Sequence, residues 1–129
     1  EKAGLADRIL FVGEHRDIER WYRPLSLFIA PQRWEGFGLT PLEAMATAVP
    51  VVATDVGAFS ELIEDSVTGT LIPRDDLGAM IAAAERWMED EAGLGQAAAN
   101  SRAHAATRFS IEGEVRRLGE IYAAAIHGQ

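Results

Sequence analysis

Two glutamates, Glu35 and Glu43, bracket a segment whose residue types could bind a phosphorylated ligand, Gly36-Phe37-Gly38-Leu39-Thr40-Pro41-Leu42. Carboxylates accept hydrogen bonds from hydroxyl groups such as those of sugars. The two glycines let a backbone approach a ligand closely, and a helix that begins after them would offer free N–H groups to a phosphate. One helix mouth could therefore hold a sugar at Glu35, a diphosphate at the helix start and a ribose at Glu43.

The same residues have a purely structural interpretation. Thr40-Pro41-Leu42-Glu43 is a capping box with proline at the first helical position, so Glu43 could be only a cap partner. Glu35 could be a solvated loop carboxylate. Leu42, Met45 and Ala46 are better interpreted as the core face of the helix than as ligand contacts. Spacing alone leaves both interpretations open.

The elements around this segment predict an α/β fold. Short apolar runs that end at Gly or Pro predict four buried strands, and the segments between and after them are helical. The predicted strands are Ile9–Gly13, Leu27–Ala30, Pro50–Thr54 and Thr70–Ile72, and the predicted helices are Asp17–Tyr22, Thr40–Thr47, Ala58–Glu64, Asp76–Asp90, Ala92–Thr107 and Ser110–Ile126. Strands that alternate with helices at short intervals indicate a parallel sheet covered by helices on both faces. We expect residues 1–129 to form one domain.

Composition narrows the classes of function. The 129 residues are 48% hydrophobic, which is enough for a core, and contain no cysteine, which excludes thiolate catalysis and Cys-based metal sites. A formal charge of −8 disfavours nucleic acid as a partner. No apolar run approaches the roughly 18 residues of a membrane span. We expect this part of the protein to be cytoplasmic. We also expect that the intact enzyme attaches peripherally to the inner membrane.

Several ordered blocks resemble glycosyltransferase family 4, whose members are retaining GT-B enzymes. The E-x7-E motif of the family is present as Glu35 through Glu43, and Glu43-Ala44-Met45-Ala46 closes it. Pro50 to Gly57 with Glu61-Leu62 matches the next block, and Asp65 to Pro73 is similar to the last strand and its turn. The resemblance covers nearly the whole chain and implies a Rossmann-like sheet, the incomplete C-terminal half of a GT-B enzyme.

The resemblance also implies roles for particular residues. Glu35 would contact the hydroxyls of the donor sugar near the reacting carbon and is the candidate catalytic residue. Gly36, Phe37, Gly38, Leu39 and Thr40 would hold sugar and diphosphate, and Glu43 would bind the ribose hydroxyls. Glu14, His15 and Arg16 would lie against the nucleobase. No cofactor or metal is expected; the donor is a nucleotide sugar, and transfer would proceed with retention.

Some family features are absent from the sequence. Ala48 stands where a helix-ending glycine is common, which predicts a positive φ at Ala48. The family's acceptor-binding N-terminal domain is missing, as are two strands that would lie beside Leu27–Ala30, so we expect no catalysis by this piece alone. Ile9–Gly13 should then either pair directly with Leu27–Ala30 or pair with another copy of the chain, since unpaired edges are unfavourable.

The amino-acid sequence of the Trp34–Glu43 segment most resembles that of lipopolysaccharide-core mannosyltransferases. This resemblance would imply GDP-mannose as the donor, and a glycan or lipid-linked acceptor bound by the missing domain. The sequence is compatible to different degrees with three alternative functions. The first is a GT-B enzyme that resembles glycogen synthase or phosphorylase. A phosphorylase would need a lysine that binds pyridoxal phosphate, and the sequence does not show one. A non-catalytic nucleotide-sugar-binding or scaffold module remains open. A dinucleotide-binding Rossmann domain is disfavoured because no G-x-G-x-x-G follows a strand.

Overall fold

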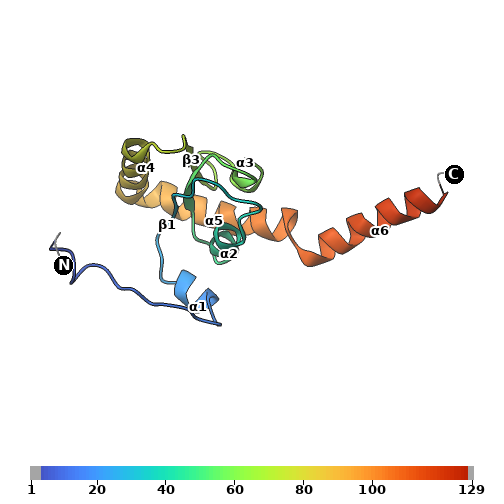
Figure 1. Cartoon of the computed structure of the whole chain (residues 1–129), viewed down its shortest axis with the longest axis horizontal. Coiled ribbons are helices and arrows are strands. Elements are labelled where there is room, and N and C mark those ends of the chain that lie inside the picture. The colour runs from blue at the N-terminus through green and yellow to red at the C-terminus, as the bar shows by residue number, and fades with distance from the viewer. Residues whose placement is uncertain (1–3, 128–129) are drawn as a thin grey trace.

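The computed structural model describes residues 4–127 and contains a small parallel sheet with helices on both faces (Figure 1). The strands lie in the order β1-β2-β3, and Phe28 is opposite Val51, which is opposite Gly69. The elements in chain order are α1 (Glu19–Tyr22), β1 (Phe28–Ala30), α2 (Leu39–Ala46), β2 (Val51–Thr54), α3 (Phe59–Leu62), β3 (Gly69–Ile72), α4 (Leu77–Glu89), α5 (Glu91–Arg108) and α6 (Ile111–His127). The predicted α/β fold class is confirmed.

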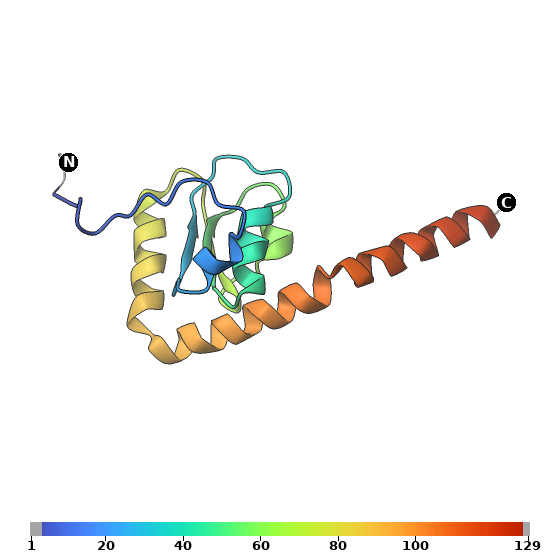
Figure 2. The same cartoon turned by 90° about the horizontal axis from the view of Figure 1, so that it is seen from below.

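The central strand β2 divides the core into two clusters. Successive strand side chains point to opposite faces of a sheet, so Val51 and Ala53 pack on one face and Val52 on the other. The first cluster contains Met45 of α2 and Phe59 of α3, and the second contains side chains of α4, namely Met80, Ala83 and Trp87. Figure 2 shows the strands between α4 on one side and α2 on the other. Both faces are buried, which explains why β2 has no polar alternation.

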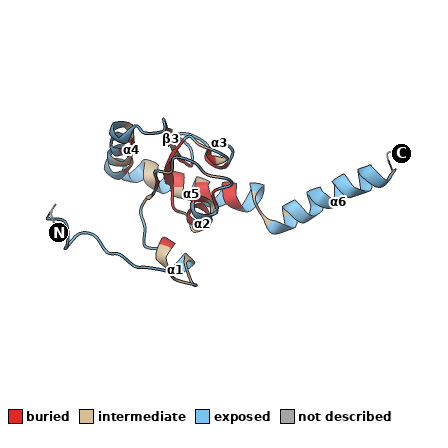
Figure 3. Ribbon diagram, in the orientation of Figure 1, coloured by how far each residue is buried: buried red, intermediate tan, exposed pale blue. Residues whose placement is uncertain are grey.

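The predicted helices are present, with bounds that differ by one or two residues from the expectation. Asp76 and Asp90 cap α4 and α5, since their side chains accept hydrogen bonds from the N–H groups of Ala79 and Gly93. Helix α6 projects away from the body and is exposed along its length (Figures 1 and 3). Within the described part of the chain, none of the helices combines the length and the apolar character that a membrane crossing requires.

The segment Ile9–Gly13, which was expected to be a strand of the sheet, is not a strand. It is irregular backbone rather than a strand, and the side chains of Leu10 and Phe11 are 79% and 92% exposed. A strand needs a hydrogen-bonding neighbour, and β1 pairs with β2 alone among the residues from 4 to 127. Direct pairing with Leu27–Ala30 in the same chain was therefore a wrong prediction. Pairing with another copy stays a prediction.

The end of α2 confirms the expectation for Ala48. Its φ is 64°, and it lies one residue beyond the C-cap Thr47. Its N–H donates to the carbonyl of Met45 and the N–H of Val49 donates to that of Ala44, the two bonds of a Schellman motif. This turn leads directly into Pro50 and β2, so it fixes how α2 returns to the sheet.

Candidate functional site

The loop that carries Glu35 begins where β1 ends, at the carboxyl edge of the parallel sheet. The hydroxyl of Thr54, at the end of the neighbouring strand β2, donates to the carbonyls of Gln32 and Ala30. Thr54 is buried, so these bonds hold the first turn of the loop from inside the sheet. In open α/β sheets ligands bind at this edge, which places the loop where a ligand site is expected.

Two glycines let the loop lie close to its neighbours. The carbonyl of Glu35 occupies the space that a Cβ on Gly57 would need, and Gly57 has a φ of 54°. A Cβ on Gly38, whose φ is 91°, would lie 2.5 Å from a ring carbon of Phe59. The backbone from Glu35 to Gly38 is thus packed against the turn before α3 and against α3 itself.

Helix α2 starts without a side-chain cap. Gly38 is its N-cap, and within residues 4–127 the N–H groups of Leu39 and Thr40 make no hydrogen bond. Pro41, the next residue, has no N–H to satisfy. Thr40 lies inside the helix, so the capping-box interpretation of Thr40 and Glu43 is wrong. The helix mouth instead offers two backbone donors and the positive end of the helix dipole, which suits an anion.

The two glutamates of the motif have different surroundings. Oε1 of half-buried Glu35 accepts from the N–H of Gly36 at 2.9 Å, which folds the carboxylate back onto its own loop. Oε2 of exposed Glu43 accepts from the hydroxyl of Tyr22 at 3.1 Å. Burial raises the pKa of Tyr22 to about 12, helped by the hydrogen bond to Glu43 and by the charge of its carboxylate. Among the described residues Glu35 and Glu43 share no hydrogen-bonding partner, so a shared cleft stays a prediction.

The loop expected to face a nucleobase lies immediately before α1. Glu14 and Arg16 are exposed, whereas the His15 ring is half-buried, 4.4 Å between centroids from the Trp21 ring. Nε2 of His15 lies 2.6 Å from the carbonyl oxygen of Val12. Helix α1 therefore touches both predicted parts of the site, since Trp21 stacks on His15 and the next residue, Tyr22, reaches Glu43.

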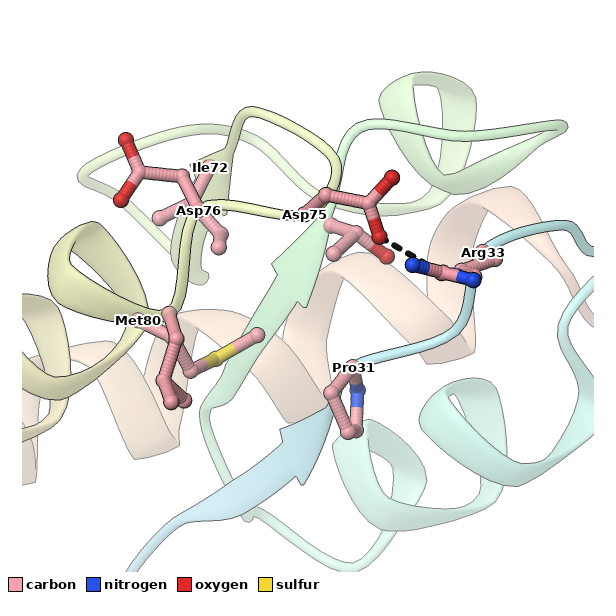
Figure 4. A pocket seen from close by; sticks show the side chains of 8 residues that line it. Pro31, Arg33, Ile72, Asp75, Asp76 and Met80 are labelled. Atoms are coloured by element: carbon pink, nitrogen blue, oxygen red, sulfur yellow. Dashed lines mark hydrogen bonds and ion pairs between the residues drawn. The ribbon is translucent and has the colours of Figure 1, made fainter.

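A cavity of about 310 Å³ lies on the α4 side of the loop and was not anticipated from the sequence (Figure 4). At its rim Nε of Arg33 is 2.6 Å from Oδ1 of Asp75, an ion pair that ties the loop to the turn before α4. Asp75 has a φ of 64°. The two residues of this ion pair are 42 positions apart in the chain, and no sequence pattern indicates that they meet. Arg33 is thus already paired with a carboxylate.

A second cavity of about 700 Å³ opens on the other side of the loop. Phe37, Leu39 and Leu42 line it together with Arg108 at the end of α5 and Arg117 in the first half of α6. Neither Glu35 nor Glu43 lines this cavity. Across residues 4–127, no group of three His, Asp or Glu side chains is placed to hold a metal ion.

The sequence is similar to a set of bacterial glycosyltransferases. Residues 1–90 match the family Glycosyl transferases group 1. The chain is 62% identical over 123 residues to the lipopolysaccharide core biosynthesis mannosyltransferase LpsB of Rhizobium meliloti (strain 1021), with 94% of this chain and 35% of LpsB covered. It is 46% identical over 120 residues to the mannosyltransferase LpcC of Rhizobium leguminosarum bv. viciae, with 93% and 34% covered.

Solved structures agree with this relationship. The C-terminal domain of LpcC, a glycosyl transferase group 1 family protein from Francisella tularensis, superposes with a TM-score of 0.75 at 31% identity, with 85% of this chain and 58% of that chain covered. Anabaena HepE in complex with UDP gives a TM-score of 0.90 at 27% identity, with 95% and 34% covered. The chain spans about a third of the length of the mannosyltransferases that it matches. It belongs to the glycosyl transferases group 1 family.

Proposed function

We propose that this chain is the donor-binding part of a mannosyltransferase of lipopolysaccharide-core synthesis, and that the donor is GDP-mannose. The observation that carries the proposal is the Glu35–Glu43 unit at the carboxyl edge of the sheet, in a chain that is 62% identical to LpsB. At that edge a bound nucleotide sugar would meet backbone donors and carboxylates together.

Each part of the donor has a matching group. The diphosphate would lie at the mouth of α2, where the N–H groups of Leu39 and Thr40 are available and the helix dipole favours negative charge. The ribose would lie at Glu43 and the sugar at Glu35, whose backbone is packed against Gly57. The purine or pyrimidine would lie beside the loop of Glu14, His15 and Arg16.

The chemistry is transfer of a mannosyl group to a hydroxyl. The bond between the anomeric carbon and the diphosphate oxygen breaks, the acceptor oxygen bonds to that carbon on the same face, and the hydroxyl proton leaves with the diphosphate. The developing charge on the diphosphate is stabilised by the preorganised N–H groups of α2, which is electrostatic catalysis. Glu35 and Glu43 act as ligands of hydroxyl groups, and the pair does not form the nucleophile and acid of a glycosidase. The acceptor would bind outside this segment, with the protein held peripherally at the inner membrane.

A UDP-sugar donor is a second candidate, favoured by the likeness to HepE, which was solved in complex with UDP and glucose. The two are distinguished by incubating the full-length native protein with GDP-mannose, UDP-glucose and UDP-N-acetylglucosamine and measuring sugar transfer to truncated lipopolysaccharide. Transfer from GDP-mannose alone is expected. Transfer from a UDP-sugar alone would replace the donor assignment. Nucleotide binding without transfer to any glycan would favour a non-catalytic binding module.

A further inference from the structure

The carboxylate of Glu43 lies on the exposed side of α2, where its position has to be fixed by a partner. A glutamate side chain in water exchanges between rotamers, and ordering it for a ligand costs conformational entropy at the moment of binding. Among residues 4–127 the Glu43 carboxylate makes a single hydrogen bond, from the hydroxyl of Tyr22 at 3.1 Å. This hydrogen bond is therefore the contact that can hold the carboxylate in one orientation.

Tyr22 is suited to hold the carboxylate because it is itself rigid. The residue is 5% exposed and belongs to the core cluster of α2 and β2. Its ring meets the Phe28 ring edge to face, with centroids 5.6 Å apart. The hydroxyl at the end of this fixed ring reaches out of the core to Glu43, so the core sets the orientation of a surface carboxylate.

The bond leaves Glu43 able to bind a diol. An ionised carboxylate has about four acceptor positions on its two oxygens, and the Tyr22 hydroxyl uses one of them on Oε2. Oε1 is left for the hydroxyls of a ligand. The Tyr22 hydroxyl is protonated at neutral pH, as any tyrosine with a pKa of 10 or above is, so it can donate to the carboxylate.

We propose that Tyr22 is a positioning residue that holds the Glu43 carboxylate in the orientation needed to accept hydrogen bonds from the 2′- and 3′-hydroxyls of the donor ribose. This inference rests on the proposed function, which places the ribose at Glu43. It adds that α1, a helix of four residues outside the E-x7-E motif, is part of the donor site. The adjacent Trp21, stacked on His15, would let the same helix hold the nucleobase loop and the ribose ligand together.

The test is the binding of GDP and UDP to the full-length native protein and to its Tyr22→Phe variant, compared with 2′,3′-dideoxy forms of both nucleotides. Phenylalanine keeps the packed ring and removes only the hydroxyl. Tyr22→Phe should weaken the binding of whichever ribonucleotide, GDP or UDP, the native protein binds. The expected loss is about fivefold, the effect of one lost hydrogen bond. The variant should also raise KM for the donor while kcat changes little. The same variant should leave the affinity of the dideoxy nucleotide unchanged. Tyr122→Phe, at an exposed tyrosine on α6, is the matched control and should change neither affinity.

The outcomes separate this inference from the proposed function. Equal weakening of the ribo and dideoxy nucleotides would mean that Tyr22 acts only through packing, and unchanged ribonucleotide binding would mean that its hydroxyl is not used; either result overturns the inference. The Glu43→Ala variant tests the proposed function itself, namely whether the ribose lies at Glu43. If Glu43→Ala leaves ribonucleotide affinity intact, the ribose does not lie at Glu43 and the proposed site fails, whatever Tyr22→Phe does. If Glu43→Ala weakens binding and Tyr22→Phe does not, only the role of Tyr22 is rejected.

Discussion

The main-chain carbonyl of Glu35 lies directly against Gly57, in the space that the Cβ of any other residue would fill. The contact joins the loop after β1 to the turn after β2, two connections that meet because parallel neighbouring strands end at the same edge of the sheet. Gly57 thereby sets the position of the Glu35 backbone and, through it, of the carboxylate assigned to the donor sugar.

Replacing Gly57 by alanine should displace this loop. The added Cβ would overlap the Glu35 carbonyl, and alanine also disfavours the φ of 54° found at Gly57. Because a small misplacement of a reacting group is costly, we expect sugar transfer by the full-length native protein to fall about 10- to 100-fold. Gly95→Ala is the control, since a Cβ at this position in α5 meets nothing within 4 Å. Normal activity of Gly57→Ala would show that the contact does not position Glu35.

The strands of the sheet could be predicted from the sequence because a strand that is buried on both faces needs a continuous run of apolar residues. Val51 to Ala53 in β2 is such a run. The same pattern failed at Ile9–Gly13, which has no neighbouring strand within the described residues and is irregular backbone. An apolar run shows that a segment can form a strand, but hydrogen-bonding partners decide whether it does.

The candidate site was predictable only in part. The loop and the start of α2 follow from glycine spacing and a strand end, since both are local signals. The partners of the site are not local: Tyr22 precedes Glu43 by 21 residues and Asp75 follows Arg33 by 42. No periodicity in one sequence links residues so far apart, because tertiary packing alone brings them together.

The two glutamates of the motif should affect different kinetic constants. Glu43→Ala is expected to weaken nucleotide binding about tenfold, since it removes charged acceptors from the ribose, which is remote from the reacting carbon. Glu35→Ala should chiefly lower kcat, because it acts on the sugar that reacts. Nucleotide affinity by calorimetry and kcat from sugar transfer measure the two effects. Equal loss of donor affinity in both variants, with kcat unchanged, would reject this division.

Ala48 offers a stabilising substitution. Its φ of 64° at the end of α2 is unfavourable for a residue with a Cβ, by about 1 kcal/mol, and glycine relieves the conflict. Ala48→Gly should therefore raise the melting temperature of the chain by a few degrees. Ala82→Gly, at an exposed position inside α4, is the matched control and should lower it, since glycine disfavours a helix interior. A lower melting temperature for both variants would show that Ala48 is not strained.

The Tyr22–Glu43 hydrogen bond should also be visible in a titration. The pKa of Tyr22 in the folded chain is about 12, above the ordinary value of 10, because of burial and then of the bond and charge of Glu43. A raised pKa of this kind contributes stability that is fully present below pH 10 and is lost as the pH rises through 12. Glu43→Gln removes the negative charge while it keeps an acceptor oxygen, so the Tyr22 pKa should move down toward 10 and remain above it through burial. The measurement is the phenolate absorbance of each protein minus that of its Tyr22→Phe counterpart, which isolates Tyr22 from Tyr122. An unchanged Tyr22 pKa in Glu43→Gln would mean that the carboxylate does not face the hydroxyl in solution, and the positioning of Glu43 by Tyr22 would lose its structural basis.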